Sequence, residues 1–327
     1  MNSKQALVIG ENAFCGLRNS IISALNQINW EIDTIDLPPL KPWYLGSLAF
    51  RIPQLSLLYR EQLIKTINSL PKHFNYKFVL VIKGPFINSR VIKIIRQKTS
   101  APIICWNPDS PFDQAMSNRG AGINRVIGLY DAYITWADDV AEQINQHNSN
   151  VGVIPFAWDP QIHNYSTGKG IARDRIVFVG TGTDIRIKLF SQLAHLNPLI
   201  FGNNWPKIKG IEILPAVYGK EMASIVAEAK WTLNILNIQN RRSHNMRTFE
   251  IPGIGGNQVT LSTNDHTKYL GEDSRTILYS SESDLEDILL SDPTKLRPRR
   301  PNILLDHTYV DRVKRLVEFL RVDDQES

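Results

Sequence analysis

The hydrophobic residues of this 327-residue chain gather in short continuous runs, and between these runs they recur at helical spacing. Such runs, without polar alternation, are typical of strands buried on both faces of a parallel sheet. The predicted strands cover residues 6–9, 78–82, 102–106, 131–135, 151–154, 175–179, 199–202, 231–236, 259–262 and 276–279. Strands that alternate with amphipathic helices predict doubly wound α/β domains.

The intervening segments carry apolar residues at a period near 3.6. They predict helices over residues 17–28, around 58–71, 91–95, 186–195, 222–229, from 283, and over 307–320. A polar, glycine-containing segment at residues 163–174 interrupts this order before the strand pattern restarts. We therefore predict two domains of ordinary size, residues 1–165 and 166–327 with the last helix in the second.

Residues 38–60 combine many aromatic and aliphatic side chains with Lys41, Arg51 and Arg60. Such a segment can contact a membrane or bind an acceptor. It can equally be an excursion that packs on its own domain, and this second interpretation is favoured.

Composition restricts the function classes. The net charge is +5, and residues 1–150 hold 15 − 11 = +4 of it against 22 − 21 = +1 for residues 151–327. This excess suits an anionic acceptor or peripheral contact with an anionic membrane, or is simply a basic surface. No nucleic-acid-binding signature is present, so nucleic acid is not an expected partner.

The chain contains no apolar run of membrane-spanning length and no signal peptide at its first residues. Cys15 and Cys105 are isolated in apolar surroundings, which fits a reducing compartment, and no Cys/His cluster has zinc spacing. We expect a cytoplasmic protein, with a peripheral position at the inner membrane face through the basic first half as an option.

The chemistry-bearing stretch is residues 234–256, which follows an apolar strand. It holds Arg241, Arg242 and Arg247, then Glu250, and closes on glycines. Arginines bind a diphosphate through paired charged hydrogen bonds, a carboxylate accepts the hydroxyls of a ribose, and glycines allow close backbone approach. The same residues also suit a solvated helix face, with the glutamate complementing the helix dipole.

Residues 247–256, Arg-Thr-Phe-Glu-Ile-Pro-Gly-Ile-Gly-Gly, resemble the Arg-x-Phe-Glu signature of the CgeB-like (spore-maturation type) glycosyltransferases. Residues 106–112 resemble the family's Trp-x-x-Asp-x-Pro-Phe element, and residues 307–312 its His-Thr-Tyr-x-x-Arg motif. The resemblance implies the GT-B fold: two Rossmann-like doubly wound α/β domains facing a central cleft, with a C-terminal helix. It also implies that the first domain binds the acceptor and the second a nucleotide-sugar donor.

The resemblance assigns expected roles to single positions. Glu250 is expected to hold the donor ribose. Arg241 and Arg247 are expected to neutralise the diphosphate, which lies near Gly255 and Gly256. The Gly180–Gly182 turn is expected to form the opposite wall of the donor site. The expected donor-binding residues are Gly180, Thr181, Gly182, Asn203, Trp205, Tyr218, Asn234, Asn237, Arg241, Arg247, Thr248, Glu250, Gly255 and Gly256.

On the acceptor side, Asp109 follows a predicted strand between prolines. It can orient or deprotonate an acceptor hydroxyl, or it can be an ordinary turn residue. The expected acceptor-side residues are Gly10, Asn12, Lys83, Gly84 and Asp109, and the expected catalytic residues are Asp109, Arg247 and Glu250.

The implied reaction moves a sugar from a nucleoside-diphosphate sugar, UDP-linked or other, to a hydroxyl of a glycan, lipid-linked, protein or small-molecule acceptor. The family implies retention at the anomeric carbon. The sequence has no Asp-x-Asp motif, so we expect neither metal nor cofactor to be required, because arginines and helix N-termini can stabilise the leaving diphosphate. Many retaining GT-B relatives carry a second Glu eight residues before the first. Arg242 occupies that position here and leaves the details of the mechanism open.

Two alternatives remain. One is a nucleotide-sugar isomerase, such as a nonhydrolysing epimerase of the same two-domain architecture. The other is a non-catalytic binding protein with a GT-B fold. A dehydrogenase is disfavoured, because neither half has the dinucleotide-binding glycine spacing.

Overall fold

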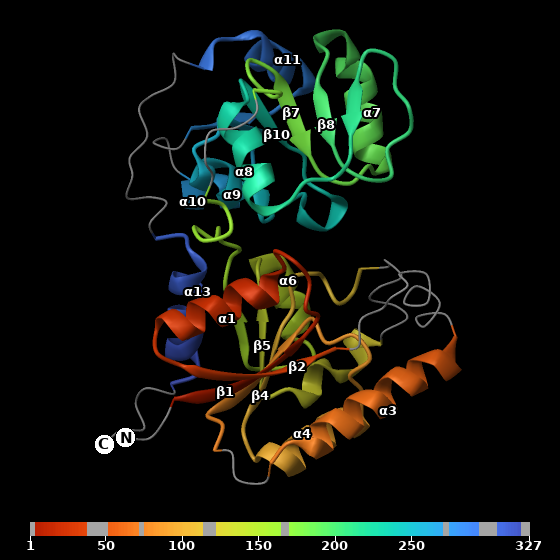
Figure 1. Cartoon of the computed structure of the whole chain (residues 1–327), viewed down its shortest axis with the longest axis vertical. Helices are drawn as coiled ribbons and strands as arrows, with labels where there is room; N and C mark the ends of the chain where they lie inside the picture. Colours follow the sequence, from red (N-terminus) through yellow and green to blue (C-terminus); the bar gives the residue numbers. More distant parts are fainter. Residues whose placement is uncertain are drawn as a thin grey trace. The chain divides into compact units, whose positions relative to one another are not determined.

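The computed structural model describes residues 4–37, 52–71, 75–113, 122–164, 170–270, 275–293 and 306–321. The chain divides into two units, unit 1 with residues 1–155 and 309–327, and unit 2 with residues 156–308. Each unit contains one six-stranded sheet whose strand pairs are all parallel (Figure 1). The predicted fold class of two doubly wound α/β domains is confirmed.

The sheet of unit 1 has the strand order β2-β1-β3-β4-β5-β6. The chain adds strands outward in one direction from β1 and in the other from β3, so its switch point lies between β1 and β3. The strands are β1 (Gln5–Gly10), β2 (Glu31–Asp36), β3 (Phe78–Ile82), β4 (Ile103–Trp106), β5 (Ala132–Thr135) and β6 (Val151–Val153).

Helices cover both faces of this sheet. α1 and α13 pack together on one face, and α3 runs along α4 on the other (Figure 1). The helices of unit 1 are α1 (Leu17–Gln27), α3 (Pro53–Ser69), α4 (Ser89–Thr99), the 3-10 helix η1 (Ile123–Leu129), α6 (Asp138–Ile144) and α13 (Tyr309–Phe319).

The last helix belongs to unit 1, whereas the sequence placed it in the second domain and put a single boundary at residue 165. The chain leaves unit 1 after Pro155 and returns to it at Tyr309. α13 buries Val313, Leu316 and Val317 in unit 1. An amphipathic stripe predicts that a helix buries one face, but it does not tell which sheet receives that face.

The sheet of unit 2 has the order β12-β11-β10-β7-β8-β9, with its switch point between β7 and β10. The strands are β7 (Ile176–Val179), β8 (Leu199–Phe201), β9 (Glu212–Leu214), β10 (Trp231–Asn234), β11 (Gln258–Leu261) and β12 (Thr276–Tyr279). The helices of unit 2 are α7 (Asp184–Gln192), η2 (Leu193–Leu196), α8 (Gly219–Glu228), η3 (Ile238–Asn240), α9 (Arg247–Ile254), α10 (Asn264–Leu270) and α11 (Glu282–Leu290).

Two strands, β2 and β9, were not predicted from the sequence. Both end the order of strands in their sheets, and β2 reads Glu-Ile-Asp-Thr-Ile-Asp with mostly half-buried or exposed residues. Edge strands need less apolar surface than central ones, so they lack the continuous hydrophobic run that identified the others.

Residues 38–51 lie outside the described residues, so the two interpretations of the 38–60 segment both stay predictions; its last part begins α3. Among the described residues, no helix combines the length and hydropathy needed to cross a bilayer. Cys15 and Cys105 are both free thiols, and Cys105 is buried in β4.

Candidate functional site

The carboxyl ends of β7 and β10 flank the switch point of unit 2, the position where doubly wound sheets bind their ligands. Arg186, from the first turn of α7, links these two strand ends. Its Nη1 donates to the carbonyl of Thr181 at 2.9 Å and its Nη2 to that of Ile235 at 2.7 Å. Burial, together with the nearby charge of Arg247, lowers the pKa of Arg186 to about 10. Within the described part of the chain no carboxylate pairs with this buried guanidinium.

Arg247 and Glu250 project from the first turn of α9 at the same point. Arg247 Nη1 forms an ion pair with Glu250 Oε2, and Arg247 Nε donates to the carbonyl of Val179 at 3.4 Å. The Glu250 side chain is only 4% exposed and that of Arg247 27%. Positions three apart share one helix face, which explains why the sequence spacing brings them together. Glu250 Oε1 has no hydrogen-bond partner among the described residues.

Helix α9 is built so that its first turn is held firmly. Asn245 lies just before the helix, and its Oδ1 accepts from the backbone N–H of Thr248 at 3.1 Å. Pro252 lies inside the helix and has no N–H for the carbonyl of Thr248. Gln258 supplies the missing donor, with its Nε2 3.3 Å from that carbonyl.

Asn234 and Thr248, both predicted to bind the donor, are instead buried in a polar network beneath the site. Asn234 Nδ2 donates to Thr248 Oγ1 at 3.3 Å and to Gln258 Oε1 at 3.0 Å, and Asn234 Oδ1 accepts from Asn245 at 2.8 Å. Thr248 Oγ1 also lies 2.9 Å from His266 Nε2. These side chains support α9 against β10, so they position Arg247 and Glu250.

His163 lies beside Arg247 and Glu250. The sequence analysis placed it only at the start of the segment between the predicted domains and gave it no role in the site. Its Nε2 lies 3.8 Å from Glu250 Oε1, and its side chain is 7% exposed. The backbone N–H of Asp159 donates to His163 Nδ1 at 3.3 Å. Nδ1 is therefore the acceptor nitrogen, and the neutral ring carries its proton on Nε2, toward the carboxylate.

Burial lowers the pKa of His163 below its ordinary value; the charge of Arg247 lowers the pKa further, while Glu250 and Asp159 raise it. The imidazole is accordingly neutral near pH 7 and acts as a hydrogen-bond donor.

The Gly180–Gly182 turn follows β7, but its glycines serve the backbone. The N–H groups of Gly180 and Gly182 donate to the carbonyls of Phe201 and Asn203, both at 2.9 Å. A Cβ on Gly182 would lie 2.4 Å from the carbonyl oxygen of Asn204, so only glycine fits there. These two amides are therefore not available to an anion, and the place of the turn as a wall of the donor site stays a prediction.

Trp205 supports the same turn. Its indole N–H donates to the carbonyl of Gly180 at 2.9 Å, and its ring packs edge-on against Phe178 and Phe190. Asn203 is exposed beside it.

Gly255 and Gly256 lie away from this group. They end α9, whereas Arg247 begins it, and a helix of eight residues is about 12 Å long. The chain then enters β11 at the amino edge of the sheet, opposite the carboxyl ends of β7 and β10. Gly256 packs against Val226 of α8, where a Cβ would lie 2.6 Å from Val226 Cγ1.

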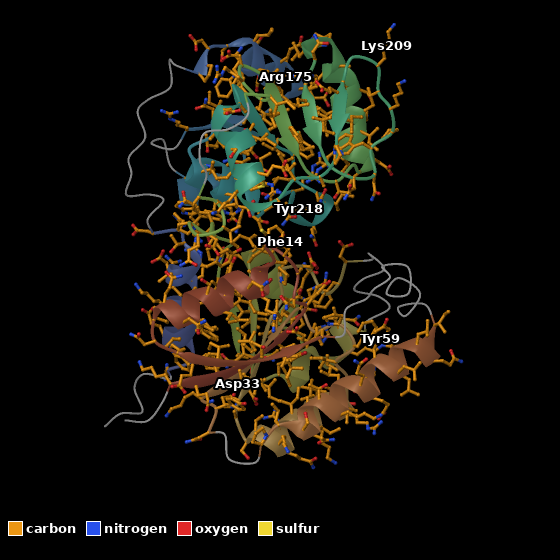
Figure 2. The ribbon with its side chains drawn as sticks, viewed as in Figure 1. Phe14, Asp33, Tyr59, Arg175, Lys209 and Tyr218 are labelled. Atoms are coloured by element: carbon orange, nitrogen blue, oxygen red, sulfur yellow. The ribbon has the colours of Figure 1, made fainter. Side chains whose placement is uncertain are left out.

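The remaining predicted donor residues are spread over the surface of unit 2. Tyr218 precedes α8 and is 53% exposed. Its side chain is labelled in Figure 2. Asn237 is half-buried before η3. Arg241 is exposed and lines a separate pocket with Tyr279.

In unit 1, the predicted acceptor-side residues follow the carboxyl ends of neighbouring strands. Lys83 and Gly84 come after β3 in left-handed conformations, with φ of 61° and 74°. Lys83 Nζ forms an ion pair of 2.5 Å with Asp109 Oδ2 in the loop after β4. Gly10 ends β1, and Asn12 donates to Asp36 at 3.2 Å. The structure therefore joins Lys83 with Asp109, while Asn12 pairs within a different cluster.

Comparison with protein families matches residues 186–318 to a family described as glycosyl transferase-like. The chain thus carries a glycosyltransferase-like domain. The match begins at Arg186 and includes α9 with Arg247 and Glu250. Among curated proteins, nothing matches this sequence.

Solved structures match over nearly the whole chain. One is the UDP complex of MnaA from S. aureus, with 13% identity, a TM-score of 0.61 and 99% of each chain covered. Another is a UDP-forming α,α-trehalose-phosphate synthase from Burkholderia xenovorans, with 11% identity, a TM-score of 0.65 and coverage of 98% of this chain and 99% of that one. The α,α-trehalose 6-phosphate synthase of Burkholderia multivorans matches with 11% identity, a TM-score of 0.63 and the same coverage.

At these identities the likeness concerns the fold alone, and the predicted GT-B fold is confirmed. Among the described residues no group of three or more His, Cys, Asp or Glu side chains could hold a metal ion. Independence of metal stays a prediction.

Proposed function

We propose that this protein is a glycosyltransferase of the CgeB-like kind, which moves a sugar from a nucleoside-diphosphate sugar to an acceptor hydroxyl. The observation that carries the proposal is the Arg247–Glu250 ion pair at the β7/β10 switch point. Its position matches the general rule for ligand binding by doubly wound sheets, and it lies within the glycosyl transferase-like match.

We propose that Arg247 and Glu250 bind different parts of the donor. Arg247 is partly exposed and can bind diphosphate oxygens through charged hydrogen bonds. Glu250 keeps one carboxylate oxygen without a hydrogen-bond partner among the described residues, and this oxygen can accept hydrogen bonds from the hydroxyls of a ribose. Arg186 adds positive charge next to the turn that follows β7. Its hydrogen bonds to the carbonyls of Thr181 and Ile235 link the carboxyl ends of β7 and β10.

The positive charges of Arg247 and Arg186 also favour the proposed chemical step. The bond between the anomeric carbon and the diphosphate breaks, a bond from that carbon to the acceptor oxygen forms, and the hydroxyl proton passes to a leaving phosphate oxygen. Negative charge grows on the diphosphate in the transition state, and the guanidinium of Arg247, held by its ion pair with Glu250, can stabilise this charge. We propose retention of anomeric configuration and no requirement for a metal.

On the acceptor side we propose that Asp109 orients the incoming hydroxyl. Lys83 holds its carboxylate at 2.5 Å, and Lys83 itself has a left-handed backbone conformation in the loop after β3. The backbone N–H of Asp109 is itself bound to Asn107 Oδ1 at 3.0 Å. A carboxylate restrained in this way can accept a hydrogen bond from the acceptor hydroxyl at low entropic cost.

The proposal is tested by incubating the purified chain with radiolabelled UDP-, GDP- and other nucleotide sugars, with and without a mixture of glycan and glycolipid acceptors. The proposal predicts release of the nucleoside diphosphate coupled to label in the acceptor. An altered free sugar nucleotide formed without acceptor would assign an isomerase instead. If the chain binds sugar nucleotides but changes none of them under any acceptor condition, it is a binding protein.

A further inference from the structure

A pocket of ≈ 460 Å³ in unit 2 lies outside the proposed donor site. Its walls are the exposed side of α7, the start of α11 and the carboxyl ends of β10, β11 and β12. Its size falls in the range of sites that hold small organic molecules. Arg241, Lys188, Tyr279 and Glu282 are its charged and phenolic side chains.

The floor of the pocket is aliphatic. It consists of Ile185, Leu189, Ile235, Leu236 and Leu261. Such a surface favours an apolar body over water, because removing apolar area from water contributes roughly 25 cal/mol per Å².

Tyr279 gives the pocket a phenolic hydroxyl. The residue is 8% exposed, and its hydroxyl has no hydrogen-bond partner among the described residues. Burial raises the pKa of Tyr279 to about 12, with the Glu282 charge acting in the same direction and the Arg241 charge against it. Because this hydroxyl faces the pocket without a partner in the described part of the chain, it can donate a hydrogen bond to a ligand that accepts one.

The charges around this hydroxyl are asymmetric. Arg241 and Lys188 have no partner in the described part of the chain, whereas Glu282 already accepts from Gln192 Nε2 at 3.2 Å. The two cations therefore remain available for a ligand, while the single carboxylate is engaged. An anion placed beside Tyr279 can accept from the phenol and pair with the guanidinium.

We propose that this pocket binds an amphipathic anion, a phosphate or carboxylate group carried on a short apolar body. The head group lies between Tyr279 and Arg241, and the body covers the aliphatic floor. This site is separate from the diphosphate site at Arg247 and does not depend on the proposed transferase activity. The two are neighbours, because Ile235 lines the pocket and its carbonyl accepts from Arg186.

Calorimetric titration of the full chain with octyl phosphate, octanoate, inorganic phosphate and octanol tests this proposal. One octyl phosphate or octanoate molecule is expected to bind per chain, at least tenfold more tightly than inorganic phosphate or octanol. Tyr279→Phe, which removes only the hydroxyl, is expected to weaken binding about fivefold, and Arg241→Gln about tenfold. The tighter of the two probes identifies the head group.

Arg242→Gln is the matched control, since Arg242 is the exposed neighbour of Arg241 and does not line the pocket. It should leave binding within twofold of the wild-type value. The proposal is overturned if neither amphipathic probe binds, or if Arg242→Gln weakens binding as much as Arg241→Gln. It is also overturned if Arg247→Gln abolishes binding while Arg241→Gln does not, because the probe then occupies the diphosphate site.

Discussion

His163 Nε2 lies 3.8 Å from Glu250 Oε1, on the side of the carboxylate opposite to Arg247. The histidine comes from the segment that enters unit 2, and the glutamate from α9. The separation is too long for a direct hydrogen bond, so a shift of about 1 Å or a bridging ligand hydroxyl would close it. His163 is therefore placed to position Glu250 for the ribose, and among the described residues no hydrogen bond joins it to Arg247.

Replacing His163 by Phe tests this positioning role. The donor N–H is lost while ring packing is kept, so UDP affinity should fall about tenfold, the value of one charged hydrogen bond. Pyrophosphate affinity should stay within twofold, because it does not involve the ribose. Calorimetry at pH 7.5 measures both, and His163→Gln, which restores a donor, should recover part of the UDP affinity. Equal losses for both ligands would show a merely structural role.

Arg247→Gln should weaken UDP and pyrophosphate alike, by about 10- to 100-fold, because it removes the guanidinium that both ligands share. It also leaves the buried Glu250 carboxylate unpaired, at a cost of about 3 kcal/mol in the free energy of unfolding. Adding Glu250→Gln in the same chain should recover most of that stability without recovering binding. Calorimetry and urea unfolding measure the two effects, and Arg242→Gln is the control. Unchanged pyrophosphate affinity in Arg247→Gln would contradict the assignment.

Asp109→Asn should reduce the transfer rate at saturating donor by about 10- to 100-fold, because the acceptor hydroxyl is then less well oriented toward the anomeric carbon. UDP affinity should not change, because Asp109 lies in unit 1. Its ion pair with Lys83 is partly exposed, so the free energy of unfolding should change by less than about 1 kcal/mol. Asp139→Asn, on α6, is the control. A wild-type transfer rate in Asp109→Asn would remove this residue from the catalytic set.

His266 makes stability depend on pH. Burial lowers its folded-state pKa from 6.5 to about 4. The unfolded chain therefore binds more protons between these two pH values, and the free energy of unfolding falls as the pH is lowered from 6.5 to 4, by about 3 kcal/mol in total. The lowered pKa of His163 contributes in the same direction.

A titration of the His266 imidazole by NMR measures its pKa directly. Urea unfolding at several pH values measures the slope, which should be smaller in His266→Gln than in the wild type. An ordinary pKa near 6.5 for this ring would refute the prediction.

The sequence predicted the central strands and selected Arg247 and Glu250 as site residues, although it did not predict their ion pair. A buried strand needs a continuous apolar run, and residues three apart on a helix share a face. β2 and β9 lack such a run, since each ends its sheet. These two strands were therefore identified from the structure and not from the sequence pattern.

The candidate site itself was only partly predictable. Gly255 follows Glu250 closely in sequence, yet α9 carries it to the opposite edge of the sheet. Asn234 was expected to contact the donor, but its side-chain amide donates its hydrogen bonds to the buried side chains of Thr248 and Gln258. His163 carried no local signal, because its environment comes entirely from the fold. Spacing therefore predicts neighbours within one helix, whereas convergence of separate segments requires the structure.

The most direct measurement is a crystal structure of the chain with UDP. The account predicts diphosphate oxygens within hydrogen-bond distance of the Arg247 guanidinium, with the ribose hydroxyls on Glu250 Oε1 beside His163. UDP bound away from the carboxyl ends of β7 and β10, or Arg247 and Glu250 still paired with no contact to the nucleotide, would contradict it.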